Sequence, residues 1–234
     1  MSARLGLPRL HLRATDSTNE RARLLASAGA PHGTLVTARE QSAGRGRQGR
    51  TWSAPPGSAL LMSLVLREPP SLMTLAAAVA VADVADVAGA DADAVIKWPN
   101  DVLLAGRGKI AGILAEARPQ EGWAVLGIGL NVAVRLEDLP VQLRGRAATL
   151  GLEPGDVEPL LASLLDALQL RLGQEPAALL SAYRRRDALR GRTMRWEHGN
   201  GVGAGIDAAG RLLVDRDDGT RIALEAGEVH LQLS

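Results

Sequence analysis

The sequence predicts an α+β fold in which a larger domain of strands and helices precedes a small all-β domain. Three observations predict it. Strand-like and helix-like apolar patterns follow one another from residue 10 to residue 189, and short strand patterns separated by glycine-bearing turns fill the rest. Apolar residues make up 46% of the 234 positions, which is enough for a packed core. We therefore expect one domain over residues 1–189 and a second over residues 190–234.

The larger domain is expected to begin with a strand and a capped helix. The strand is Leu10–Ala14, and the helix opens at Asp16 and runs to about Ala28. Ser17 and Glu20 fit a capping box, in which both side chains bind the first free N–H groups of the helix. The later strands are expected at residues 34–40, 58–67, 94–97, 102–104, 109–117 and 123–134, and the later helices at residues 72–88, 157–172 and 176–189.

The sequence pattern changes from Gly191 onward, where glycine-bearing turns recur at short intervals. This spacing is typical of a small β-barrel. The expected turns are Gly199–Gly201, Ala209–Gly210, Asp218–Gly219 and Gly227. The expected strands between them are residues 193–198, 202–207, 211–215, 220–225 and 229–233.

Charge and composition exclude several classes of protein. The net charge of +1 offers no global field for DNA or membrane surfaces, and the absence of cysteine excludes disulfides, thiolate metal sites and cysteine nucleophiles. The longest apolar stretch, Leu75–Ala90, contains Asp83 and Asp86 and is too short to span a bilayer. Residues 1–10 lack a secretory apolar core. We expect a cytoplasmic protein with no membrane contact.

Lysine is rare in this chain. Of 27 basic residues only Lys97 and Lys109 are lysine, and both fall in one short segment. A compact, flexible ammonium cannot be replaced everywhere by the planar guanidinium of arginine. In a chain that otherwise uses arginine, two neighbouring lysines therefore mark a candidate functional segment. For either lysine alone, its retention by chance is the alternative.

A glycine–arginine loop at Gly44–Thr51 resembles two phosphate-binding motifs, G-x-G-x-x-G and the P-loop. Both motifs require a helix to begin at the loop, and Pro55-Pro56 soon after it blocks one. We reject both interpretations. Three arginines within a flexible loop could instead close over an anion, and a solvated basic turn is about equally consistent with the segment alone.

Two further segments place polar side chains at strand ends. Lys97–Asp101 ends a strand with a cation, an indole, a proline, an amide and a carboxylate, and could face a ligand or form only a buried corner. Lys109–Glu116 starts a strand after the tight turn at Gly106–Gly108, and its Gly112 permits close approach of a ligand. Gly127–Val132 repeats that pattern. Both strands could also be only a tightly packed pair.

These motifs, in this order, resemble the catalytic core of biotin–protein ligases from about Leu10 to Asp187. The resemblance implies a mixed-sheet catalytic domain of the class II aminoacyl-tRNA synthetase and biotin ligase type, followed by an SH3-like β-barrel. It also implies ATP-dependent formation of biotinyl-5'-AMP and transfer of biotin to a lysine of a carrier domain. The cofactors and substrates implied are biotin, ATP and Mg²⁺.

The resemblance assigns a role to individual residues. Ser17, Thr18, Asn19 and Gln41 would hold the ureido head group of biotin. Arg45, Gly46 and Arg47 would close over biotin and the adenylate phosphate, and Lys109, beside Gly112, would bridge the biotin carboxylate and the α-phosphate. Trp52 would pack near adenine, and Lys97, Asn100 and Asn131 would contact the nucleotide. Asp101 is a candidate acceptor of the proton from the attacking lysine. Lys109, Arg45, Arg47 and Asp101 are thus the expected catalytic residues, and no metal-ligating side chains are expected.

The expected partner is the biotin carboxyl carrier domain of acetyl-CoA carboxylase or a related carboxylase, with a homodimer as a further expectation. Longer family members carry an N-terminal DNA-binding domain. No helix-turn-helix pattern precedes Leu10 here, so we expect neither repression nor sequence-specific DNA binding. Gln232 stands where the best-known family form has an arginine, so a nucleotide role for the tail is left open.

Two rival functions follow from the same residues. A lipoate or octanoate transferase of the same superfamily is disfavoured by the triple-arginine loop and the Lys97–Asp101 corner. A non-enzymatic ligand sensor or RNA-binding module is the second rival, and low net charge and few aromatic residues argue against nucleic-acid binding. Transfer of radiolabelled biotin to an acceptor domain in the presence of ATP would separate all three.

Overall fold

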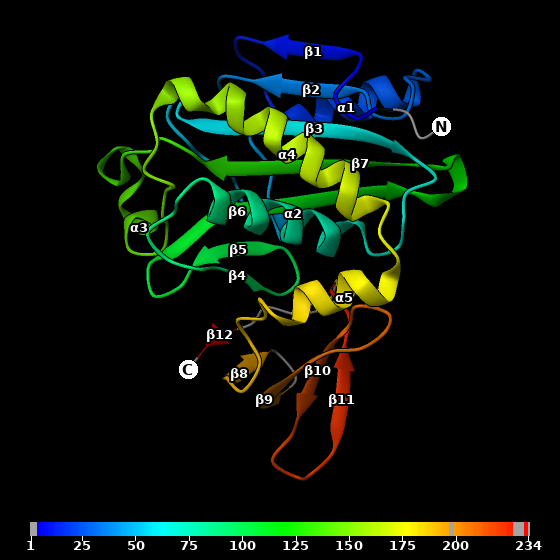
Figure 1. Cartoon of the computed structure of the whole chain (residues 1–234), viewed down its shortest axis with the longest axis vertical. Helices are drawn as coiled ribbons and strands as arrows, with labels where there is room; N and C mark the ends of the chain where they lie inside the picture. The colour runs from blue at the N-terminus through cyan, green and yellow to red at the C-terminus, as the bar shows by residue number, and fades with distance from the viewer. Residues whose placement is uncertain (1–3, 197–198, 227–231, 234) are drawn as a thin grey trace.

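The larger domain is built on one mixed seven-stranded sheet (Figure 1). The computed structural model describes residues 4–196, 199–226 and 232–233. The strand order is β1-β2-β3-β7-β6-β5-β4, in which only β1 and β2 pair in parallel. The strands are β1 (Arg9–Leu12), β2 (Leu35–Ala38), β3 (Ala59–Arg67), β4 (Ala94–Lys97), β5 (Asp101–Leu104), β6 (Gly108–Arg118) and β7 (Trp123–Asn131). The expected mixed sheet is confirmed.

Helices cover both faces of this sheet. α1 (Thr18–Ser27) packs on one face, and α2 (Met73–Val87) and α4 (Val157–Leu172) cover the other, followed by α5 (Pro176–Arg184) (Figure 1). α2 is apolar on most sides because it lies between the sheet and α4. No helix among residues 4–196, 199–226 and 232–233 is both long enough and apolar enough to span a membrane.

The two aspartates of α2 do not disturb the apolar packing because each has an arginine partner. Asp83 lies 2.7 Å from Arg171 Nη2 of α4, and Asp86 lies 2.6 Å from Arg186 Nη1 after α5. Arg186 also contacts Asp83 at 2.9 Å. These pairs tie the three helical segments together at the rim of the core.

The C-terminal strands form a separate antiparallel sheet in the order β11-β10-β9-β8-β12. The turn expected at Gly199–Gly201 is wrong, because these residues begin β9. A Cβ on Gly201 would lie 2.7 Å from Val214 Cγ1, so the close approach of β10 explains the glycine there. The expected Gly227 turn lies outside the described residues. The strands are β8 (Thr193–Trp196), β9 (Gly199–Ile206), β10 (Leu212–Asp215), β11 (Arg221–Leu224) and β12 (Gln232–Leu233).

The connection between the two sheets is itself paired with the larger one. Ile96 N donates to Arg186 O at 2.6 Å, and Ala188 N donates to Ile96 O at 2.9 Å. α5 therefore ends at Arg184 rather than at the expected Leu189, because the chain leaves the helix to pair with β4. The domain boundary after residue 189 stays a prediction.

Candidate functional site

One cavity of about 1080 Å³ gathers all the residues to which the resemblance assigned a role in binding or catalysis. The predicted residues come from five separate segments, which converge where the loop after β2 crosses the ends of β5, β6 and β7. Their individual roles stay predictions. The predicted residues lining it are Ser17, Thr18, Asn19, Gln41, Arg45, Gly46, Arg47, Trp52, Lys97, Asn100, Asp101, Lys109, Gly112 and Asn131.

Glycines without side chains form the part of the sheet that lines the cavity, which we call its floor. Gly112 of β6 pairs with Gly129 of β7, and the Trp52 ring lies over both. A Cβ on Gly129 would lie 2.5 Å from Trp52 Cε2, and one on Gly112 would lie 3.0 Å from Lys109 Nζ. Side chains at these positions would displace Trp52 or Lys109, which accounts for glycine in both strands.

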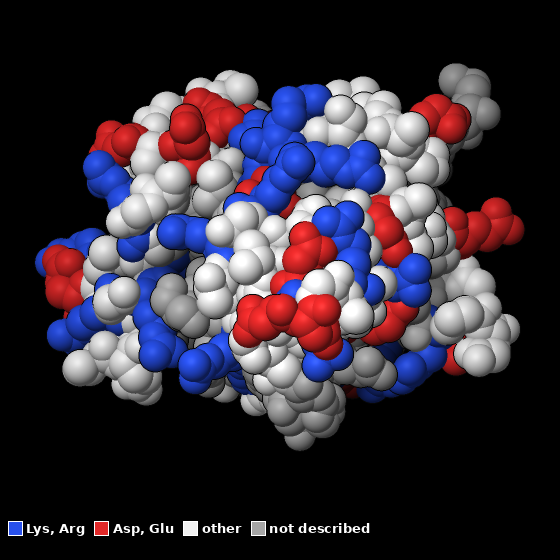
Figure 2. All heavy atoms as spheres, turned by 90° about the horizontal axis from the view of Figure 1, so that it is seen from below, with Lys and Arg blue, Asp and Glu red and all other residues white. Residues whose placement is uncertain are grey.

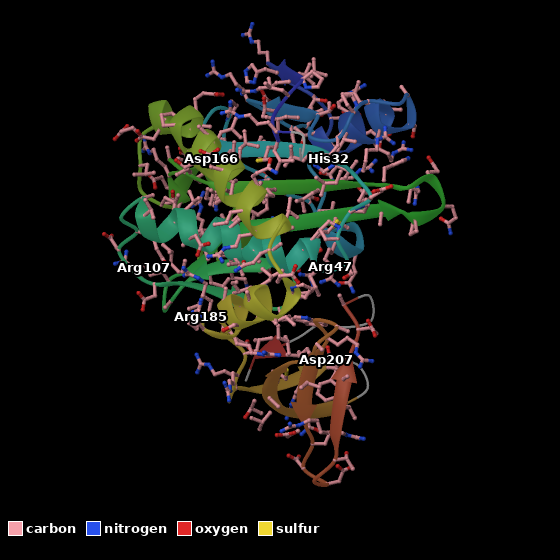
Figure 3. All side chains as sticks on the ribbon, turned by 45° about the vertical axis from the view of Figure 1, so that its right-hand side comes forward. His32, Arg47, Arg107, Asp166, Arg185 and Asp207 are labelled. Atoms are coloured by element: carbon pink, nitrogen blue, oxygen red, sulfur yellow. The ribbon has the colours of Figure 1, made fainter. Side chains whose placement is uncertain are left out.

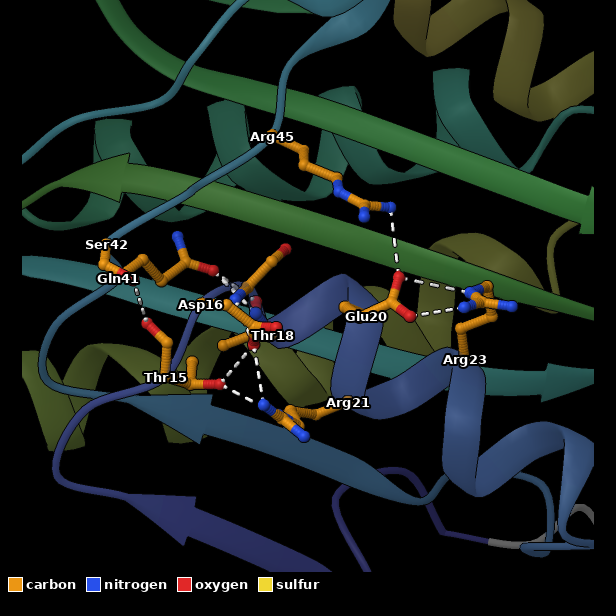
Figure 4. A network of polar contacts seen from close by, with 10 residues as sticks. Thr15, Asp16, Thr18, Glu20, Arg21, Arg23, Gln41, Ser42 and Arg45 are labelled. Atoms are coloured by element: carbon orange, nitrogen blue, oxygen red, sulfur yellow. Dashed lines mark hydrogen bonds and ion pairs between the residues drawn. The ribbon is translucent and has the colours of Figure 1, made fainter.

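The end of the cavity beside α1 is neutral and polar. Gln41 Oε1 accepts from Thr18 N at 2.7 Å and from Thr18 Oγ1 at 3.1 Å. Figure 4 shows Gln41 reaching across from the chain after β2 to the start of the helix. We call Ser17, Thr18, Asn19 and Gln41 the neutral end. Ser17, Thr18 and Asn19 are nearly inaccessible to solvent, so their polar atoms depend on partners within the protein.

The expected capping box at this helix is wrong. Ser17 occupies the N-cap position without a side-chain cap bond, and Gln41 instead binds the N–H of Thr18. Glu20 turns outward to Arg23 and to Arg45 Nη1, 3.1 Å away (Figure 4). The hydrogen bond from Arg23 lowers the pKa of Glu20 below its ordinary value. A tertiary contact and two cations have thus replaced a local motif.

The glycine–arginine loop contains no α-helix, which confirms the rejection of both phosphate-binding motifs. It forms only a short 3₁₀ turn at Arg47–Gly49. Arg47 Nη1 donates to Asn100 Oδ1 at 3.2 Å, and its other terminal nitrogen donates to Ala226 O of the C-terminal segment. Figure 3 shows Arg47 between the large sheet and the C-terminal strands. Burial lowers the pKa of Arg47.

The rest of the cavity lining is strongly cationic. Among the described lining residues, Asp101 is the sole carboxylate, and six side chains are basic. This excess of basic side chains in the lining favours an anionic ligand. Figure 2 shows that on the molecular face seen from below, groups of Lys and Arg side chains are interspersed with Asp and Glu. We call the six residues the cationic end: Arg45, Arg47, Arg50, Lys97, Lys109 and Arg146.

Lys109 and Asp101 form the central contact of this end. Lys109 Nζ lies 2.6 Å from Asp101 Oδ1 and 5.6 Å from the centroid of the Trp52 ring. In the register of β4 and β5, Asp101 also lies directly opposite Lys97. Burial lowers the pKa of Lys97, an effect that the nearby Asp101 partly opposes. The tight turn at Gly106–Gly108 confirms the predicted placement of Lys109 at a strand mouth.

The two asparagines predicted to contact the nucleotide, Asn100 and Asn131, also bind the backbone around the cavity. Asn100 Nδ2 donates to Ile113 O at 2.8 Å, and Asn131 Nδ2 donates to Ala148 O at 2.8 Å. Both amide nitrogens therefore have backbone partners. The bond to Ala148 O fixes the orientation of the Asn131 amide. The side-chain oxygen of Asn100 accepts a hydrogen bond from Arg47.

The sequence did not predict that the segment after β7 also lines the cavity. Leu139, Leu143 and Arg146 line the cavity from the short helix α3 (Val141–Arg144) and its flanks. The four-residue spacing of the two leucines is the only signal of an apolar face there. Within the described part of the chain, no group of three His, Cys, Asp or Glu residues could hold a metal ion.

The chain is similar to known proteins in both sequence and fold. The model of the biotin/lipoate A/B protein ligase family matches residues 12–132. The biotin–[acetyl-CoA-carboxylase] ligase of Mycobacterium tuberculosis is 36% identical over 93% of this chain and 87% of its own length. The bifunctional ligase/repressor BirA of Bacillus subtilis is 40% identical over 60% of this chain and 45% of its own, so the chain spans about half of that relative. The structure of the Aquifex aeolicus biotin protein ligase with biotin and ATP superposes with a TM-score of 0.82, at 25% identity, covering 97% of this chain and 99% of that one.

Proposed function

Because the chain belongs to the biotin/lipoate A/B protein ligase family, we propose that it is an ATP-dependent biotin–protein ligase. The observation that carries this proposal is the polarity of the cavity, with a neutral hydrogen-bonding end and a cationic end joined over a glycine floor. Biotin has the matching shape, since a neutral cyclic urea lies at one end and a carboxylate at the other. ATP supplies further anionic groups for the cationic end.

Activation requires two anions to meet. An oxygen of the biotin carboxylate attacks the α-phosphorus of ATP, the bond to the pyrophosphate oxygen breaks, and biotinyl-5'-AMP and pyrophosphate result. Lys109 would bind the carboxylate and the α-phosphate together, and Arg45 and Arg47 would offset the remaining charge. Lys97, Asn100, Asn131 and Trp52 would contact the nucleotide.

Transfer follows when a lysine amine of the carrier domain attacks the acyl carbon. The amide bond forms, the bond from the acyl carbon to the phosphate oxygen breaks, AMP leaves, and the amine loses a proton. Asp101 is the sole carboxylate among the described lining residues and is the candidate proton acceptor. Its contact with Lys109 would be loosened when an anion takes the ammonium.

The described residues do not form a cage for Mg²⁺, since a single carboxylate lines the cavity and it is paired with Lys109. Mg²⁺ bound to ATP would be held mainly by phosphate oxygens. The proposed location of the reaction is the cytoplasm, and the proposed acceptor is the carrier domain of a biotin-dependent carboxylase.

The proposal is tested by incubating the protein with ATP, a purified biotin carboxyl carrier domain and either radiolabelled biotin or radiolabelled octanoate. We expect label on the carrier only with biotin and only with ATP. Labelling from octanoate but not from biotin would favour the lipoate-type alternative. Binding of biotin without any transfer would favour a sensor.

A further inference from the structure

A polar relay lies behind the neutral end and contains two residues that do not line the cavity. Ser63 of β3 is 0% exposed although it sits within an otherwise apolar strand. Its Oγ lies 2.6 Å from Asn19 Oδ1 and 2.9 Å from Thr18 Oγ1. Glu116 of β6 accepts from Asn19 Nδ2 at 2.9 Å. Ser63 and Glu116 thus approach Asn19 from two different strands.

Glu116 determines which way the Asn19 amide faces. An ionised carboxylate only accepts hydrogen bonds, so the Asn19 atom beside it must be the nitrogen. That nitrogen also lies 3.4 Å from Leu114 O, a second acceptor. The oxygen must then face Ser63, whose hydroxyl donates to it, and it lies over Gly127 at the cavity wall. Asn19 therefore presents an acceptor to the cavity wall, not a donor.

Gln41 is oriented by an independent contact. Thr18 N is a backbone donor, so the Gln41 atom 2.7 Å away must be the oxygen. The amide nitrogen of Gln41 is then directed away from the helix, toward Gly44, where a Cβ would lie 2.9 Å from it. The neutral end presents one amide oxygen and one amide nitrogen in fixed positions. A cyclic urea, with N–H donors and a carbonyl acceptor, has the complementary pattern.

We propose that Glu116 and Ser63 are positioning residues that hold the Asn19 amide with its oxygen toward the cavity, where that oxygen can accept from an N–H of the urea. The inference rests on the proposed function. Without Glu116, the Asn19 amide loses the partner that distinguishes its two ends. Without Ser63, the buried Asn19 oxygen loses its donor, which costs binding energy.

The test measures binding of biotin and of ATP to the protein. Calorimetry of wild type, Glu116→Ala, Ser63→Ala and Glu116→Gln gives the Kd values. We expect both alanine variants to bind biotin about tenfold more weakly and to bind ATP as tightly as wild type. Glu116→Gln keeps an acceptor oxygen for Asn19 Nδ2 and should retain most of the biotin affinity. KM for biotin should rise in the alanine variants, while kcat and the KM for ATP should not change.

Ser58→Ala is the matched control, since Ser58 is also buried but bonds Pro55 O outside the relay. It should leave the binding of biotin and of ATP unchanged. A wild-type Kd for biotin in Glu116→Ala and Ser63→Ala would overturn the inference. An equal loss of biotin and ATP affinity in those variants would also overturn it, because a general structural defect would explain both. Absence of biotin binding by the wild type would instead overturn the proposed function.

Discussion

The two ends of the cavity are built in opposite ways. At the neutral end, each polar atom of Asn19 has a partner, and those partners come from regular strands. At the cationic end, six basic side chains and one carboxylate line the cavity, and three of the six are on one loop. Arg45 of that loop also has a carboxylate partner outside the lining, Glu20. Recognition of the neutral group is therefore prepared before binding by fixed dipoles, whereas the excess positive charge of the cationic end is offset only in part until an anionic ligand binds.

The largest effect is expected from a substitution of Lys109, at the centre of the cationic end. Lys109→Ala should slow adenylate formation about a hundredfold to a thousandfold, because a contact that strengthens as charge builds on phosphate costs about 3–4 kcal/mol when removed. Lys109→Arg should rescue this only partly, since a planar guanidinium cannot occupy the same point. Pyrophosphate release with saturating biotin and ATP measures the rate.

Arg107→Ala is the control for that experiment, because Arg107 lies in the neighbouring turn, is exposed and pairs only weakly with Asp91 at 3.3 Å. It should keep the wild-type rate. A Lys109→Ala variant that retained most of the wild-type rate would remove Lys109 from the proposed chemistry.

A second change separates the two half-reactions. Asp101→Asn should slow transfer of biotin to the carrier domain about tenfold to a hundredfold, as expected for loss of a general base. Adenylate formation should persist, because Lys109 loses only its resting partner. Single-turnover transfer from preformed biotinyl-5'-AMP isolates the second step. Equal slowing of both half-reactions would contradict this division of roles.

The third prediction concerns order in the loop. We expect residues 42–50 to be mobile without ligand. Tryptic cleavage at the arginines of this loop should slow about tenfold when biotinyl-5'-AMP is present at about ten times its Kd. Cleavage at Arg216, in the exposed turn between β10 and β11, serves as an internal control and should not change. Unchanged cleavage in the loop with biotinyl-5'-AMP present would show that it does not close.

The smallest effect is a pH dependence of stability. Burial lowers the pKa of Lys97, so the folded state binds this proton less tightly than the unfolded chain. Wild type should therefore gain stability as pH rises through the lowered pKa toward the ordinary value for lysine, about 10.4. Lys97→Met should be more stable than wild type at pH 7, and the difference should shrink toward pH 10. Urea denaturation at several pH values measures it, and a difference independent of pH would contradict the assignment.

Local sequence was sufficient for much of the site. The Gly106–Gly108 turn placed Lys109 at a strand mouth, and the prolines after the arginine loop excluded a helix there, because turns and proline act over a few residues. The predicted glycines also lie in paired strands as expected. The capping box failed for the opposite reason, since Gln41 comes from a distant segment and takes the donor that the motif would have bound.

The sequence by itself determined the α+β class, the order of most elements and the set of residues that converge on one cavity, because periodicity, turns and rare residue types are local properties. Only the tertiary structure decided which of these residues touch. The Asp101–Lys109 contact depends on a register shift between β5 and β6, and the relay depends on β3, β6 and α1 meeting around Asn19. Such contacts are set by strand register and packing across the sheet, where a shift of one residue turns a side chain to the other face.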